Sequence, residues 1–151
     1  MRIRQATVDD YPQLLKLKQE FFDWESGTDD RIDPSYRSHI GPRLGRDLRR
    51  DTCAYFVAQE GKELTAYAGM EVKKSGQEYR TRKYAYIFHL YAKNGHRGKG
   101  IGSQLLTACM AWARRQGLKE VHIKVHAFNK DAWRLYKKRF KDYLMTLIAK
   151  T

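Results

Sequence analysis

Apolar residues recur at helical spacing in the first part of the chain. Leu14, Leu17, Phe21 and Trp24 follow one another at intervals of three or four residues, which is the spacing of one helix face. Pro12 suits the first turn of such a helix, where a backbone N–H would have no partner. The pattern therefore predicts a short strand at residues 2–7 and a helix that ends near residue 25. A loop at residues 26–34 and a weakly helical segment at residues 35–50 follow.

Strand-like patterns fill the middle of the chain. Aromatic and β-branched residues are concentrated in residues 53–60, 64–74 and 83–93, and the turn sequences "EGKE" and "SGQEYR" separate these runs. Strands joined by such short turns pair antiparallel. Apolar residues alternate again over residues 120–127, and a last apolar run predicts a final strand at residues 143–150.

Two more helices are predicted between these later strands. The first covers residues 100–116 and the second, short and basic, covers residues 129–140. The first has an apolar stripe at nearly regular four-residue spacing, formed by Ile101, Leu105, Cys109 and Trp112. The resulting order, β α α β β β α β α β, predicts an α/β (α+β) fold with one mixed, mostly antiparallel sheet and helices on both faces. We expect a single domain over residues 1–151.

Composition narrows the function classes. A hydrophobic content of 42% is that of a globular protein, and no apolar run approaches the length of about 20 residues that spans a bilayer. The N-terminal sequence has no apolar signal-peptide core, and Cys53 and Cys109 lie far apart, so we expect reduced thiols and a cytoplasmic location.

Charge is unevenly distributed. The formal net charge of +13 favours anionic ligands such as nucleic acid, an anionic membrane or a phosphorylated molecule. Residues 20–33 are the exception, because they carry six carboxylates and a single arginine. Any ligand proposed for this protein has to account for both the basic and the acidic region.

The stretch "NGHRGKGIGSQLL" at residues 94–106 places four glycines before a helix. A helix N-terminus exposes unpaired N–H groups, and missing Cβ atoms let a phosphate approach them closely. A Walker A loop does not fit, because Lys99 lies between glycines, and the dinucleotide fingerprint fails at Ser103. The spacing that does fit is Arg97-x-x-Gly100-x-Gly102.

This motif resembles the pyrophosphate loop of the GNAT superfamily, the acyl-coenzyme A N-acyltransferases. A second motif in "IKVHAFNKDAWRLYKKRF" resembles the family's V-x-x-x-N-x-x-A-x-x-L-Y-x-x-x-x-F signature through Val125, Asn129, Ala132, Leu135, Tyr136 and Phe140. The order of strands and helices is similar over essentially the whole chain. The chain departs from the family pattern at Arg139, where the family usually has glycine, and at Ala66, where it often has glycine. It also departs at Phe88 and His89, where the family commonly has a carboxylate.

The resemblance implies acetyl-CoA as co-substrate and assigns its binding residues. Backbone groups of Leu90, Tyr91 and Ala92 would pair with the pantetheine arm, and Asn129 would contact the same arm. The pyrophosphate would be held by the backbone N–H groups of Arg97, Gly98, Lys99, Gly100, Ile101, Gly102 and Ser103.

Three residues are candidates for catalysis. Tyr136 matches the family's tyrosine that protonates the departing thiolate, and a phenol with a pKa of about 10 can do this. His89 is the leading side chain for deprotonating the amine, because imidazole titrates near neutral pH. Glu71 in the neighbouring strand is the second candidate base, and a chain of water molecules is the third.

A metal is not expected, because His122 and His126 are about 13 Å apart on a strand, too far for joint ligation. The predicted function is transfer of an acetyl group from acetyl-CoA to a primary amine by direct attack in a ternary complex. The carboxylates of residues 20–33 favour a small cationic acceptor. Alternatives are a protein N-terminal or lysine acetyltransferase and, remotely, a basic nucleic-acid-binding protein. By resemblance, we expect a homodimer and no membrane partner.

Overall fold

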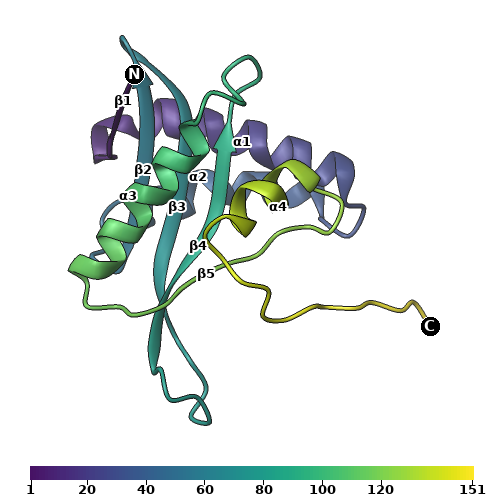
Figure 1. The fold of residues 1–151 in the computed structure, drawn as a ribbon. Helices are drawn as coiled ribbons and strands as arrows, with labels where there is room; N and C mark the ends of the chain where they lie inside the picture. Colours follow the sequence, from purple (N-terminus) through teal and green to yellow (C-terminus); the bar gives the residue numbers. More distant parts are fainter.

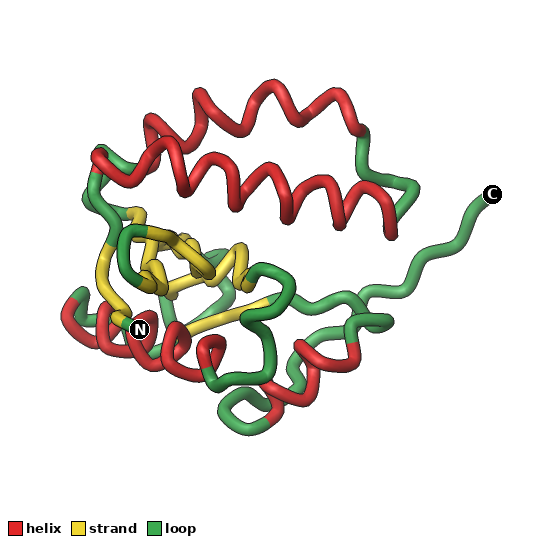
Figure 2. Tube along the Cα trace, turned by 90° about the horizontal axis from the view of Figure 1, so that it is seen from above, coloured by secondary structure: helices red, strands yellow, loops and turns green.

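The computed structural model describes all of residues 1–151 and has three layers (Figure 2). A five-stranded sheet lies between one pair of helices, α1 and α2, and a second pair, α3 and α4. The strands are β1 (Arg2–Gln5), β2 (Cys53–Glu60), β3 (Glu63–Lys74), β4 (Lys83–Ala92) and β5 (Val121–Ile123). The α-helices are α1 (Tyr11–Thr28), α2 (Ile40–Asp47), α3 (Ile101–Arg115) and α4 (Lys130–Lys137), and 3₁₀ turns cover Val8–Asp10 and Pro34–His39.

The strands are arranged in the sheet in chain order. β1 to β4 form an antiparallel meander, while β5 pairs parallel with β4 through three residue pairs at Ala85, Tyr86 and Ile87. The crossover from β4 to β5 runs through α3, which is the connection that a parallel pair requires. The fold class is as predicted: a mostly antiparallel sheet flanked by helices on both faces.

Each face of the sheet has its own core. The face under α3 has 15 buried residues, among them Phe56, Met70, Ile87, Leu105 and Trp112. The face under α1 and α2 has eight, among them Leu14, Leu44, Val57 and Tyr67. The alternation of β2 and β3 sends neighbouring side chains to opposite cores, which is why both strands are buried along most of their length.

Helix boundaries follow local sequence signals. α3 ends at Arg115 and is closed by Gly117, whose φ of +74° is the left-handed conformation that glycine adopts most readily. The N–H of Leu118 donates to the carbonyl of Ala113. α1 continues to Thr28, three residues beyond the predicted end, so the predicted loop at 26–34 begins later. None of the helices combines the length and apolar composition that a bilayer crossing demands.

The predicted final strand at residues 143–150 is not formed. The chain has no regular structure after Lys137, and Leu144, Met145 and Leu147 are 80–85% exposed. It extends away from the sheet (Figure 1). An alternating apolar pattern supplies side chains for a strand, but the backbone also needs a paired neighbour, and this segment has none. Likewise, the strand predicted over 120–127 pairs only at Val121–Ile123.

Candidate functional site

An opening in the sheet lies between β4 and β5. The two strands pair only as far as Ile87 and Ile123, whereas β4 continues to Ala92 against β3. The edge of residues 88–92 that faces away from β3 therefore has no strand opposite it. Leu90, Tyr91 and Ala92, the residues predicted to pair with pantetheine, all lie along this open edge. An extended ligand could add to it as a strand does.

A β-bulge marks the start of the opening. Gly69 pairs with His89 and Met70 pairs with Ile87, so Phe88 is an extra residue in β4. Because of the bulge, Phe88 and Tyr91 pack against the core under α1 and α2, while Ile87 and Leu90 pack against the core under α3. A Cβ at Gly69 would overlap the ring of Phe88 and would lie 2.8 Å from Tyr55 Cε1. Glycine at position 69 is therefore required for the bulge.

The glycine loop joins the open end of β4 to α3. Gly98 and Gly100 have φ values of +77° and +78°, and a Cβ at either position would meet no atom within 4 Å. Backbone N–H groups from Arg97 to Ser103 find no acceptor in the protein. The loop therefore combines open space, unpaired donors and the positive end of a helix, as an anion site requires.

The missing Cβ of Gly102 serves packing, while its backbone N–H is unpaired and stays a predicted pyrophosphate donor. A Cβ there would lie 2.8 Å from Leu135 Cδ2 and 3.7 Å from Leu90 Cδ2. The missing Cβ lets α4 pack closely against the first turn of α3, so the space is filled by protein and not left for a phosphate. The Arg97 side chain also turns inward, because its Nε donates to the carbonyl of Ala92 at 2.9 Å.

α4 carries two predicted residues and packs near the open edge, because its Leu135 and Leu90 of β4 both lie against Gly102. Asn129 caps the helix, since its Oδ1 accepts the N–H of Ala132 at 3.2 Å, which leaves the amide NH₂ without a partner. Tyr136 is 7% exposed and packs edge-to-face on Phe140, and its hydroxyl makes no hydrogen bond in the protein. Burial raises the pKa of Tyr136 to about 12, so the phenol keeps its proton at neutral pH.

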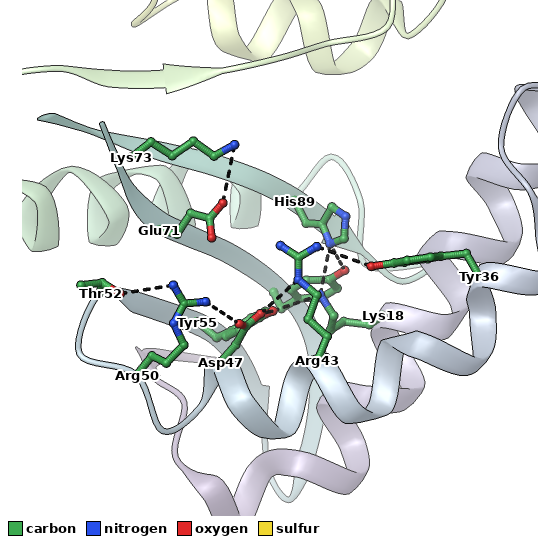
Figure 3. Close-up of polar contacts among 11 residues, drawn as sticks. Lys18, Tyr36, Arg43, Asp47, Arg50, Thr52, Tyr55, Glu71, Lys73 and His89 are labelled. Carbon is green, nitrogen blue, oxygen red and sulfur yellow. Dashed lines mark hydrogen bonds and ion pairs between the residues drawn. The ribbon is translucent and has the colours of Figure 1, made fainter. Parts of the chain in front are cut away.

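His89 is enclosed by donors on the side of α1. Its Nδ1 lies 3.1 Å from the Tyr67 hydroxyl. Lys18 Nζ lies 3.4 Å from the same nitrogen, and Figure 3 shows Lys18 beside the His89 ring. An ammonium group can only donate, so Nδ1 accepts and the neutral ring carries its proton on Nε2. Burial, followed by the charges of Lys18 and Arg43, holds the pKa of His89 well below its ordinary value. This arrangement makes His89 a hydrogen-bond donor and argues against the predicted role as base.

A buried ionic network continues from Lys18. Its Nζ donates to the Tyr55 hydroxyl at 3.1 Å, and that hydroxyl donates to Asp47 Oδ2 at 3.2 Å. Asp47 also faces Arg43 and Arg50 at 3.6 and 3.2 Å (Figure 3). Lys18 is 5% exposed, and burial lowers its pKa to about 8. The sequence signal for it was available: a lysine on the buried face of α1, between Leu14 and Phe22.

Glu71 lies away from the bulge. It pairs with Tyr86 in the sheet register, two residues along β3 from Gly69, and its carboxylate faces Lys73 at 3.8 Å. Figure 3 shows this carboxylate on the side of Lys73 and separate from His89. Nothing in the geometry brings Glu71 to the opening between β4 and β5.

The acidic segment divides into carboxylates with different partners. Asp23 pairs with Arg37 at 2.9 Å on the surface, and Asp33 accepts the N–H of Ser35 at the start of a 3₁₀ turn. Asp29 lies 3.4 Å from His126 Nε2. Glu25 makes no hydrogen bond or ion pair, and sequence reasoning did not single it out for catalysis. The segment is therefore not one uniform acidic surface.

Metal ligation has no support in the side-chain arrangement. No group of three or more His, Cys, Asp or Glu residues is placed to hold an ion. His122 stacks on Tyr84 and faces Glu120, while His126 stacks on Phe128 and faces Asp29. The two histidines thus have separate partners.

Solved structures of similar fold include acetyltransferases. A tetramutant of the BH1408 protein from Bacillus halodurans aligns with a TM-score of 0.82 at 22% identity, covering 99% of this chain and 100% of that one. AAC(6')-Iy in complex with a CoA-linked acetylneamine bisubstrate analogue aligns with a TM-score of 0.80 at 14% identity, covering 99% and 97%. A predicted acetyltransferase with acetyl-CoA from Clostridium acetobutylicum gives 0.79 at 19% identity, covering 99% and 95%.

Sequence comparison places the chain in a family. It is 26% identical over 110 residues to N-acetyltransferase 8B of Rattus norvegicus, a match that covers 67% of this chain and 48% of that protein. The chain thus spans about half the length of this curated relative. The model of the Acetyltransferase (GNAT) family matches residues 11–141, which include the sheet opening, the glycine loop and Tyr136. The chain belongs to the GNAT acetyltransferase family.

Proposed function

We propose that this protein transfers an acetyl group from acetyl-CoA to the primary amine of a small cationic molecule. The observation that carries the proposal is the open edge of β4 leading directly into a glycine loop with unpaired N–H groups. An extended arm that ends in a pyrophosphate matches this edge and loop. Two of the similar structures are complexes with a CoA-linked analogue and with acetyl-CoA, which supports the same choice of donor.

The reaction in this site is direct attack by the amine. Leu90, Tyr91 and Ala92 would hold the pantetheine arm, and an unpaired N–H of β4 would polarise the thioester carbonyl. The deprotonated amine nitrogen forms a bond to the carbonyl carbon, and the C–S bond then breaks with its electron pair on sulfur. Tyr136 is the proton donor to that thiolate, because its buried phenol is protonated at neutral pH. The extra proton that the new amide nitrogen still carries passes to solvent, from which the phenol that protonates the sulfur regains its own proton.

The acceptor class follows from the other side of the opening. On that side, Asp29 lies 3.4 Å from His126 Nε2, the His126 ring stacks on Phe128, and the Phe128 ring contacts Trp24. The carboxylate of Glu25 interacts electrostatically with the same His126. Carboxylates and aromatic faces together attract organic cations. The aminoglycoside acetyltransferase among the similar structures supports an amine of this kind.

The test measures free thiol release from acetyl-CoA across polyamines, aminoglycosides, amino acids, and peptides with a free N-terminus or lysine. We expect turnover with cationic small molecules and none without an acceptor. Turnover confined to peptides would replace the acceptor class, and salt-sensitive binding of random DNA without any thermal shift from acetyl-CoA would overturn the function. A cytoplasmic location and a homodimer stay predictions from the sequence.

A further inference from the structure

α1 crosses the opening in the sheet. Lys18 and Phe21 contact His89 on β4, with the rings of Phe21 and His89 centred 4.7 Å apart. Further along α1, the Trp24 ring lies 6.4 Å from Phe128, which follows β5. The helix therefore passes from β4 to the segment beyond β5 within about two turns, and Figure 1 shows it running behind β4 toward the side of α4.

Glu25 is the carboxylate that α1 places over this opening. It follows Phe21 by four residues and Lys18 by seven, so all three share one helix face. That face is the one turned to the sheet, because Lys18 and Phe22 are buried on it. Glu25 is itself partly buried, and its carboxylate makes neither a hydrogen bond nor an ion pair. Its oxygens therefore stay accessible to solvent and to a ligand and are not paired within the protein.

The charged and titratable groups facing Glu25 come from every element around the opening. They are His126 after β5, Asp29 after α1, Lys18 on α1 itself, and the hydroxyls of Tyr67 on β3 and Tyr86 on β4. Burial raises the pKa of Glu25, and the charges of His126 and Lys18 oppose the rise. The side chain is therefore more basic than a surface glutamate, which suits a proton acceptor.

The other candidate bases are occupied or distant. Nδ1 of His89 accepts from Tyr67 and faces Lys18, and Nε2 carries the proton of the neutral ring. Glu71 faces Lys73 two residues along β3 from the bulge. Among the carboxylates of α1, Glu20 accepts the hydroxyl of Tyr91 on β4 at 3.4 Å and Asp23 pairs with Arg37, whereas both oxygens of Glu25 are free.

We propose that Glu25 binds the ammonium group of the acceptor and takes its proton before attack. The inference rests on the proposed acetyl transfer. One N–H bond of the ammonium breaks, the proton moves to a Glu25 oxygen, and the nitrogen lone pair becomes free to attack the thioester carbonyl carbon. Glu25 loses the proton to solvent after the acetylated product leaves.

The experiment compares pH profiles of kcat for the wild-type enzyme and the Glu25→Gln variant with the best amine of the thiol-release panel. In the wild-type enzyme, kcat should rise as pH increases through the pKa of Glu25 in the complex, because only the carboxylate accepts a proton. In Glu25→Gln we expect kcat to fall by about 100-fold or more and this acid limb to disappear. The affinity for acetyl-CoA should stay unchanged, since the groups proposed to bind it belong to the β4 edge, the glycine loop and α4 and do not include Glu25.

Three further variants separate catalysis from folding. Asp23→Asn is the matched control, because it removes a carboxylate of the same helix that is paired with Arg37 on the surface, and it should keep the wild-type profile. His89→Asn should keep the acid limb even if kcat falls. In Glu25→Ala, added formate should restore part of the activity.

The outcomes distinguish the two proposals. A wild-type enzyme without turnover on any amine overturns the acetyl transfer itself. A wild-type enzyme with turnover, together with a Glu25→Gln variant that keeps the acid limb, overturns only the role of Glu25. Loss of the limb in His89→Asn but not in Glu25→Gln would return the role of base to His89.

Discussion

The two faces of the sheet solve different problems. The face under α3 is an apolar core in which Tyr136 is the one phenol, and its link to the proposed coenzyme is made by backbone groups of the glycine loop. The face under α1 and α2 has a smaller core that contains a chain of polar contacts. In this chain Lys18 donates to the Tyr55 hydroxyl, which donates to Asp47. The backbone donors of the loop would bind the pyrophosphate, which is the same group whatever the acceptor is. The side chains of the other face would determine which acceptor binds. Sequence motifs therefore describe the first face far better than the second.

The largest expected effect comes from breaking the ionic network of the acceptor face. Asp47→Ala leaves the nearby charges of Lys18 and Arg43 without their buried counterion and the Tyr55 hydroxyl without its acceptor. The free energy of unfolding should fall by about 3–5 kcal/mol, measured by urea denaturation. Asp23→Ala, which removes an exposed pair with Arg37, should cost about 1 kcal/mol or less. Equal losses in both variants would contradict the distinction between the network and the surface.

The pH dependence of stability sharpens the same point for Lys18. Its pKa is about 8 in the folded protein against an ordinary 10.5, so between these values the unfolded chain binds more protons. Stability should therefore rise with pH across this window, by about 3 kcal/mol relative to a Lys18→Met variant. The comparison with Lys18→Met removes the opposite contribution of the buried tyrosines, which both proteins share. Parallel curves from urea denaturation at pH 7 to 10 would exclude a buried ammonium.

On the coenzyme face, Tyr136→Phe tests a single hydroxyl. The hydroxyl makes no hydrogen bond in the protein, so its removal should change the unfolding midpoint little. Loss of a general acid should lower kcat by about 100-fold. A variant with normal kcat would assign Tyr136 to packing alone. A variant with a large loss of stability would indicate a hydroxyl partner in solution.

The smallest expected effect is on coenzyme affinity in Gly100→Ala. The residue has a φ of +78°, and a non-glycine residue there costs about 1–2 kcal/mol, so the Kd for acetyl-CoA should rise about tenfold. Calorimetric titration measures it. Gly61→Ala is the control, because Gly61 has a φ of +58° in a hairpin outside the loop and should lose stability without losing affinity. Equal affinity in all three proteins would contradict the loop as the phosphate site.

The sequence predicts an element correctly where a local signal, such as glycine spacing or apolar periodicity, is sufficient by itself. Glycine spacing located the loop, and apolar periodicity located both helix faces and the meander. The prediction of a strand at residues 143–150 was wrong, because a strand needs a neighbouring strand to pair with, and its own residues do not specify one. Sequence alone cannot show that Leu135 fills the space beside Gly102, so the missing Cβ there gave no sign of its role in packing. The sequence does not single out Glu25 among the carboxylates of residues 20–33, because only the path of α1 shows that Glu25 and Asp23 lie on different faces of the helix.

The short pairing of β5 has a consequence for the motions of the protein. Beyond Ile123, no backbone hydrogen bond ties the chain to the sheet, and α4 is held by side chains such as Leu135 against Gly102 and Arg139 against Ser103. We expect amide hydrogens of α4 to exchange with solvent faster than those of α3, through local opening that leaves the meander intact. A ligand that bonds to the β4 edge and touches α4 would slow that exchange. Part of its binding free energy would then be spent on completing the fold.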